Sequence, residues 1–113
     1  LAARGLLAPR LVLWSGEFGR TPTSQGGTGH NHNPYGYSMW MAGGGIRGGR
    51  AIGATDELGL RAIADPFHIH DSHATILSLI GLDHRKLTYL HQDREMRLTD
   101  VAGENDLSSR LLS

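Results

Sequence analysis

The short apolar run "RLVLW", residues 10–14, places the strongest constraint on the fold of this 113-residue chain. The run is nearly continuous and has a β-branched residue at its centre. It follows "LAARGLLAP", which predicts the end of a helix, because the residue before a proline is disfavoured in helical backbone. Continuous apolar runs are typical of strands covered on both faces in a parallel sheet. The run therefore predicts an α/β fold with a mainly parallel sheet.

A helix after this sheet is predicted by the stretch "DSHATILSLIG". Either Asp71 or Ser72 can cap its first free amides, so the helix should run over residues 72–80. His73, Ile76, Leu77 and Ile80 fall on one face at helical spacing, and Ile76, Leu77 and Ile80 should be buried. Burial of such side chains contributes about 1.5–3 kcal/mol each before entropy is counted, so this face should pack on the sheet.

The segments between these elements predict loops and short strands. Residues 15–36 are rich in glycine, proline and small polar side chains, so we expect a long loop at the carboxyl end of the first strand. Residues 37–42, "YSMWMA", predict a second buried strand, paired with the first. The following "GGGIRGG" lacks the lysine and hydroxyl of a phosphate loop and predicts a turn. Further on, we expect a short strand and loop near residues 50–63, a small β excursion around residues 97–98, and a polar turn or helix at the end.

Composition excludes several classes of function. Eleven basic residues balance eleven acidic ones, so no polyanion-binding surface and no nucleic-acid partner are predicted. Cysteine is absent, so a metal site must use histidine, carboxylate or water. No apolar segment approaches the roughly 20 residues that span a bilayer, and the first ten residues lack the apolar stretch of a signal peptide. The chain begins at Leu1, which fits a fragment or a processed product.

Three of the seven histidines lie within six positions, in "DPFHIHDSHATIL" at residues 65–77. His68 and His70 would leave the same face of an extended segment, and His73 follows one helical turn later. This spacing predicts a ligand-binding cluster where a strand ends and a helix starts. The alternative is that these imidazoles make hydrogen bonds to backbone or water at the helix start.

A second set of candidate ligands lies in the glycine-rich loop and just before it. Glu17 follows the first strand, and His30 and His32 lie in "GHNHNPYG". Carboxylate and imidazole together suit a divalent ion of the zinc, calcium or magnesium class. Two alternatives stay open: Glu17 can form a surface ion pair with Arg20, worth about 0–1 kcal/mol, and the two histidines can belong to an exposed loop.

Five stretches in this order carry a family resemblance: "LVLWSGEFGRTP", "HNPYGYSMWMAGGG", "GATDELG", "HIHDSHATILSLIGLDHRKLTY" and "RLTDV". They resemble the carboxyl-terminal portion of the domain of unknown function 1501 family, a branch of the superfamily of alkaline phosphatases and sulfatases. The resemblance covers nearly the whole chain. It implies that residues 1–113 are the carboxyl-terminal part of one α/β/α sandwich whose amino-terminal half is absent.

The resemblance also assigns metal ligands. The stretch "SGEFG" resembles the superfamily's serine-aspartate-histidine-glycine motif, which places Glu17 on a metal-binding aspartate and Phe18 on a metal-binding histidine. Phenylalanine cannot bind a metal, so the resemblance does not carry over a complete two-metal site. His32 resembles the later metal-binding histidine, with His30 as its rival. The nucleophile and the first metal aspartate come from the amino-terminal half, so no catalytic residue is assigned here.

Two functions are compatible with these residues. In the first, the parent protein is an exported or periplasmic, metal-dependent hydrolase of phosphate or sulfate esters, acting on a small molecule or a polysaccharide. Glu17 and His32 then bind the metal, while Arg20, His68, His70 and His73 line the site. In the second, the chain is a non-catalytic binding or structural module, as the departure at Phe18 allows. In either case we expect the fragment to be inactive alone and to self-associate through exposed sheet edges.

Overall fold

The computed structural model describes residues 1–23, 26–27 and 29–112. Residues 24, 25 and 28 of the predicted loop lie outside this part. The chain divides into two compact units. Unit 1 comprises Leu1–Gly43 and Gly48–Pro66, and unit 2 comprises Gly44–Arg47 and Phe67–Ser113.

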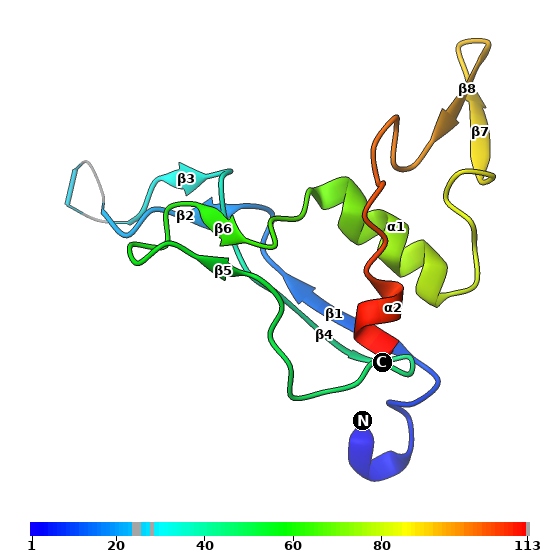
Figure 1. Cartoon of the computed structure of the whole chain (residues 1–113), viewed down its shortest axis with the longest axis horizontal. Helices are drawn as coiled ribbons and strands as arrows, with labels where there is room; N and C mark the ends of the chain where they lie inside the picture. The colour runs from blue at the N-terminus through cyan, green and yellow to red at the C-terminus, as the bar shows by residue number, and fades with distance from the viewer. Residues whose placement is uncertain (24–25, 28, 113) are drawn as a thin grey trace. The chain divides into compact units, whose positions relative to one another are not determined.

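Short strands dominate the described part of unit 1, in which the only helix is a single turn (Figure 1). Its elements are η1 (Ala2–Arg4), β1 (Leu11–Ser15), β2 (Gly19–Arg20), β3 (His32–Asn33), β4 (Met39–Gly43), β5 (Ala54–Thr55) and β6 (Ala62–Ala64). Unit 2 has two helices and one strand pair. Its elements are α1 (Ile69–Leu79), β7 (Thr88–His91), β8 (Arg94–Arg97) and α2 (Ser108–Leu112).

A long irregular hairpin forms the larger part of unit 1. β1 pairs with β4 in antiparallel register, with Leu11 opposite Gly43, and β2 pairs with β3 in the same sense, with Arg20 opposite His32. Beyond them the N–H of Thr21 donates to the carbonyl of Asn31 at 2.9 Å. The two arms therefore fold back on each other from β1·β4 out to this bond, and β1 and β4 confirm the two strands predicted from the apolar runs.

The predicted α/β/α sandwich with a mainly parallel sheet is wrong, because the strands of residues 1–23, 26–27 and 29–112 form four separate antiparallel pairs. Parallel neighbours need a crossover of about a dozen residues or more, usually a helix. In the described part of residues 16–38, the connection between β1 and β4 holds no helix and instead forms β2·β3. The apolar run is also not covered on both faces, since Trp14 and its cross-strand partner Trp40 are exposed.

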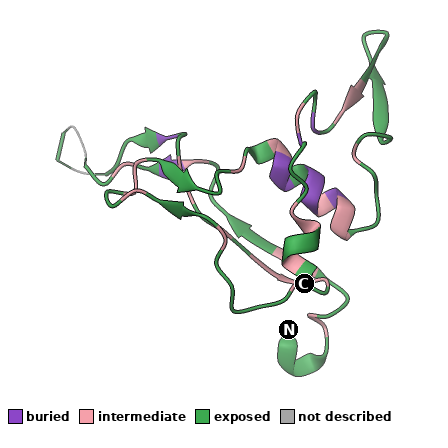
Figure 2. Ribbon diagram, viewed as in Figure 1, coloured by how far each residue is buried: buried purple, intermediate pink, exposed green. Residues whose placement is uncertain are grey.

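α1 is the most buried element of the chain (Figure 2). Ala74 and Thr75 are almost completely inaccessible and Leu77 is buried, while Ile76 is half-buried. The predicted burial of Ile80 is wrong: it is the C-cap, one residue beyond the last residue of α1, and is 58% exposed. Among the described residues, Ala74 and Leu77 are the only buried hydrophobic side chains, so the apolar core is small. A domain with so little buried apolar area gains little hydrophobic stabilisation of its own.

The second helix and the strand pair β7·β8 complete unit 2. The N–H of Leu107 donates to Oγ1 of Thr75 at 3.0 Å and fastens the start of α2 to α1. β7·β8 turns through Gln92 and Asp93, both with positive φ, as a two-residue hairpin turn requires. This hairpin is the β excursion predicted near residues 97–98, and α2 is the predicted terminal helix.

Candidate functional site

The long hairpin of unit 1 carries all the candidate residues predicted upstream. Glu17 is exposed in the bend between β1 and β2, Arg20 lies on β2, and His32 lies opposite it on β3. His30 is exposed on the segment leading into β3, and its carbonyl accepts a long hydrogen bond, 3.4 Å, from Nη1 of Arg20. The hairpin thus brings Arg20 and His32 together as cross-strand neighbours.

Phe18 is the central contact of this group. Its ring lies against the imidazole of His32, with 3.7 Å between ring centroids and a tilt of 31°. The guanidinium carbon of Arg20 lies 5.2 Å from the centroid of the same phenyl ring. Phe18, which the family resemblance places at a metal-histidine position, therefore packs on one candidate ligand and beneath a cation.

Asn33 is a structural residue of this region that the sequence reading missed. It is 3% exposed, its Nδ2 donates to the carbonyl of Leu60 at 2.8 Å, and its Oδ1 accepts from the N–H of Tyr35 at 3.1 Å. The bond to Leu60 ties β3 to the loop before β6, and the bond from Tyr35 closes a local turn directly after β3. The Asn-Pro dipeptide, which often marks a turn, is the signal that points to it.

The histidine cluster of unit 2 surrounds the start of α1. His68 is the N-cap: its Nδ1 accepts from the N–H of His70 at 3.2 Å. The ring of His70 lies 4.7 Å from that of His68 and 6.3 Å from that of His73, measured between centroids. Nδ1 of His70 is buried and has no hydrogen-bond partner in the described part of the chain.

The predicted start of α1 at residue 72 is wrong. α1 begins at Ile69, three residues before the predicted start, because His68 caps it and Asp71 closes a capping box from within the first turn. The carboxylate of Asp71 accepts from the N–H of His68 at 2.9 Å and from the N–H of Asn105 at 3.2 Å. The alternative reading of the histidines, as partners of backbone groups at a helix start, is confirmed for His68.

A complete metal site is not assembled by these groups alone. Within residues 1–23, 26–27 and 29–112, no three histidine, aspartate or glutamate side chains converge closely enough to hold one ion. Glu17 and His32 have suitable donor chemistry, but a protein site needs at least one further ligand. Glu17 and His32 alone would supply two ligands, and any further ligand would have to come from groups outside this set.

A hollow of about 350 Å³ in unit 2 was not predicted. Six residues from the end of α1, the turn after it and the approach to α2 line it: Ser78, Gly81, Leu82, Asp83, His84 and Asp106. Partial burial acts to raise the pKa of Asp106. Hydrogen bonds from the backbone and hydroxyl of Ser108, a hydrogen bond from Ser78 and the nearby imidazole of His84 outweigh it, so the pKa lies below its ordinary value.

Comparison with known proteins gives one match. The sequence model of the family described as "Protein of unknown function (DUF1501)" matches residues 1–108. No curated protein and no solved structure is significantly similar to the chain. In the described part, no helix has both the length and the apolar character needed to cross a membrane.

Proposed function

We propose that this chain, which belongs to the family of proteins of unknown function DUF1501, is part of a metal-dependent hydrolase of phosphate or sulfate esters. The resemblance of the stretches around Glu17 and His32 to alkaline phosphatases and sulfatases supports this proposal. The chain would be the carboxyl-terminal part of an exported or periplasmic protein, whose other part supplies the nucleophile. Its substrate would be a small molecule or polysaccharide bearing the ester.

The contact between Phe18 and His32 carries the proposal. It fixes the imidazole of His32 on β3 against the residue that follows Glu17 in the chain. Residues 17 and 18 form a bend, so the alternation of side chains along a strand does not force Glu17 away from His32. A carboxylate and an imidazole on the two arms of one hairpin are two suitable ligands for a divalent ion.

Arg20 adds a reason to expect an anionic substrate. Its guanidinium packs over Phe18 and lies across the strand pair from His32, and the residue is exposed. A planar guanidinium matches the oxygens of phosphate and sulfate groups in a two-pronged arrangement. A bound divalent ion would polarise the ester oxygen and lower the pKa of the nucleophile. Arg20 would then hold the non-reacting oxygens of the ester.

Metal analysis of the intact parent protein tests the assignment. We expect Glu17→Gln and His32→Ala each to weaken metal binding at least about tenfold. Removing a residue that only supports a metal ligand already lowers metal affinity by about this factor, and removing the ligand itself should lower it at least as much. His30→Ala is the matched control and should leave the metal content unchanged. Unchanged metal content in both the Glu17 and the His32 variants would eliminate the shared site.

A gain-of-function variant sharpens this test. Phe18 stands where the superfamily resemblance expects a histidine, so Phe18→His adds a third donor beside His32. We expect this variant to bind zinc more tightly than the wild type, while Phe18→Leu does not. Hydrolysis of p-nitrophenyl phosphate and p-nitrophenyl sulfate by the metal-loaded parent protein then distinguishes the two ester classes.

The second candidate function is a non-catalytic binding or structural module. Phe18 and the lack of a three-ligand group among the described residues favour it. Under this alternative, the purified parent protein hydrolyses neither ester at any metal concentration. Arg20→Ala would then leave ester hydrolysis at zero, as in the wild type. Phe18→Leu would change the free energy of unfolding and no enzymatic activity.

A further inference from the structure

The N-cap of α1 is an imidazole, which is an unusual choice. His68 has extended backbone angles, φ −81° and ψ 156°, and its Nδ1 accepts the N–H of His70. Helix N-caps are commonly Ser, Thr, Asp or Asn, whose oxygens remain acceptors throughout the range of pH 5 to 8. An imidazole accepts a hydrogen bond only while it is neutral, and histidine changes charge within this range.

Protonation of His68 would reverse the interaction at the cap. Nδ1 would become an N–H donor facing the N–H of His70, so the bond at 3.2 Å would be lost. The added positive charge would lie at the helix N-terminus, where the macrodipole disfavours cations. Both effects weaken the first turn of α1 as the pH falls.

The charges around the cap lie on both packed segments. His70 and His73 occupy the same turn and add positive charge when protonated, and Arg110 of α2 lies 5.9 Å from the ring of Phe67, which precedes the cap. The carboxylate of Asp71 attracts these cations, but it already accepts from two backbone N–H groups.

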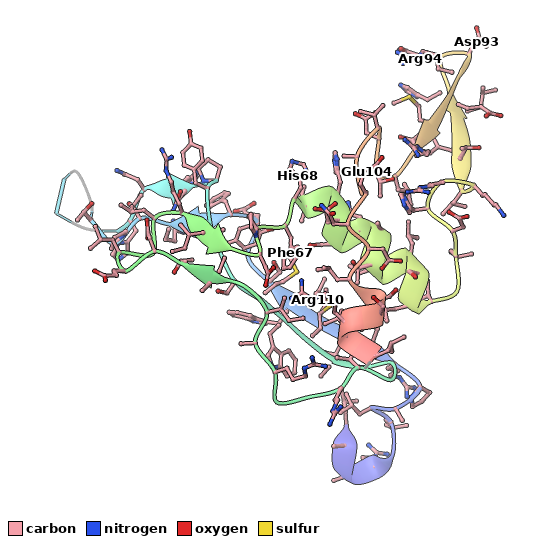
Figure 3. The ribbon with its side chains drawn as sticks, viewed as in Figure 1. Phe67, His68, Asp93, Arg94, Glu104 and Arg110 are labelled. Atoms are coloured by element: carbon pink, nitrogen blue, oxygen red, sulfur yellow. The ribbon has the colours of Figure 1, made fainter. Side chains whose placement is uncertain are left out.

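On the segment that packs against this turn, Glu104 and Asp106 flank Asn105 and contribute negative charge (Figure 3). The hydrogen bond of the N-cap is nevertheless lost whenever Nδ1 carries a proton, whatever the charges around it. The nearby carboxylates therefore do not preserve the cap.

We propose that His68 makes the first turn of α1 a proton-sensitive latch, closed while its imidazole is neutral and open once the imidazole is protonated. α1 holds the segment of residues 103–107 through three hydrogen bonds. In the first turn, the carboxylate of Asp71 accepts from the backbone N–H and from Nδ2 of Asn105, and in the next turn Oγ1 of Thr75 accepts from the N–H of Leu107. Opening the turn releases the Asn105 end of this segment first. This inference does not depend on the proposed hydrolase activity.

Hydrogen–deuterium exchange of the full chain at pH 7.5 and 5.5, corrected for intrinsic exchange rates, tests the latch. We expect protection of the amides of His70 and Asn105 to fall about fivefold at the lower pH, equivalent to the roughly 1 kcal/mol of a lost cap. The amide of Ile80, bonded to the carbonyl of Ile76 at the far end of α1, is an internal reference for global unfolding. Its protection should change much less.

The variants identify the responsible imidazole. His68→Asn keeps an acceptor that does not titrate, so its pH dependence should disappear, and His68→Ser serves the same purpose if the asparagine variant folds poorly. His73→Asn removes an imidazole from the same turn without touching the cap, so it should keep most of the pH dependence. Two results would overturn the latch. One is a folded His68→Asn variant whose amides lose as much protection at pH 5.5 as those of the wild type, and the other is a wild type whose amides lose no protection at pH 5.5.

Discussion

Trp14 lies directly opposite Trp40 in the antiparallel pair β1·β4, and the two residues are 68% and 56% exposed. In the described chain each of these strands has a single ladder partner, so one edge of each strand is open. Exposed aromatic side chains beside open edges promote association. We therefore predict that the isolated chain forms oligomers, as the sequence led us to expect.

Light scattering coupled to size-exclusion chromatography measures this association. Replacing both tryptophans with lysine should weaken it by about tenfold or more, because a tryptophan at the centre of an interface often contributes at least 2 kcal/mol. Leu58→Lys, at a residue 67% exposed outside this strand pair, is the control. A wild-type chain that runs as a monodisperse monomer with a cooperative thermal transition contradicts the prediction.

Asn33→Ala should destabilise unit 1 by about 1–3 kcal/mol, because it removes a buried side chain and leaves the partly buried carbonyl of Leu60 and N–H of Tyr35 without their side-chain partners. Asn33→Asp should also destabilise, since a carboxylate cannot donate to Leu60. The matched control is Asn31→Ala at an exposed position of the same hairpin. Urea denaturation followed by tryptophan fluorescence measures the difference, and equal midpoints for both alanine variants would contradict it.

The strands were predictable from the sequence, but their direction was not. The run at residues 10–14 marks β1 because branched and aromatic side chains favour extended backbone. Whether a strand pair is parallel depends on what covers its faces and on the path of the connection. Trp14 and Trp40 look the same in sequence whether they are buried or exposed. The connection of residues 16–38 gave no sign that it folds back through β2·β3.

The candidate site was predictable in part for a related reason. The family resemblance singled out His32 as a candidate ligand, but the packing of Phe18 on its ring depends on the register that places β2 against β3. The extended segment considered for His68 and His70 ends at His68, because His70 already lies in α1. The role of His68 as a cap was missed, because oxygen-bearing side chains were available at Asp71 and Ser72.

Gly43→Ala should be among the most damaging single substitutions in unit 1. Gly43 has a φ of 79°, and an added Cβ would collide with the carbonyl oxygens of Arg10 and Leu7. Gly49→Ala is the matched control, since its φ of 75° carries the same backbone strain while no atom lies within 4 Å of its added Cβ. We expect the Gly43 variant to lose at least about 1 kcal/mol more than the control in denaturant unfolding. If both variants lose the same free energy of unfolding, backbone strain and not the collision of the added Cβ determines the loss.

Asp106 should make unit 2 sensitive to acid. Its Oδ1 accepts from the N–H of Ser108 at 2.8 Å, at the start of α2, and its pKa lies below the ordinary 3.8. A carboxyl whose pKa is lowered by folding stabilises the folded state above its unfolded pKa, and this stabilisation is lost as the pH falls through the folded pKa. Because the group is largely exposed, solvent screening keeps the contribution below about 1 kcal/mol.

Urea unfolding of the wild type and of Asp106→Asn between pH 7 and pH 2 measures this contribution. The variant should be less stable at pH 7, because it loses the charge but can still accept from Ser108. The difference should shrink below pH 4 and disappear once the wild-type carboxyl is protonated. Glu95→Gln, on an exposed strand of β7·β8, is the control for general effects of charge removal. A stability difference that stays constant down to pH 2 would mean that Asp106 acts through its shape and hydrogen bonding, and not through its charge.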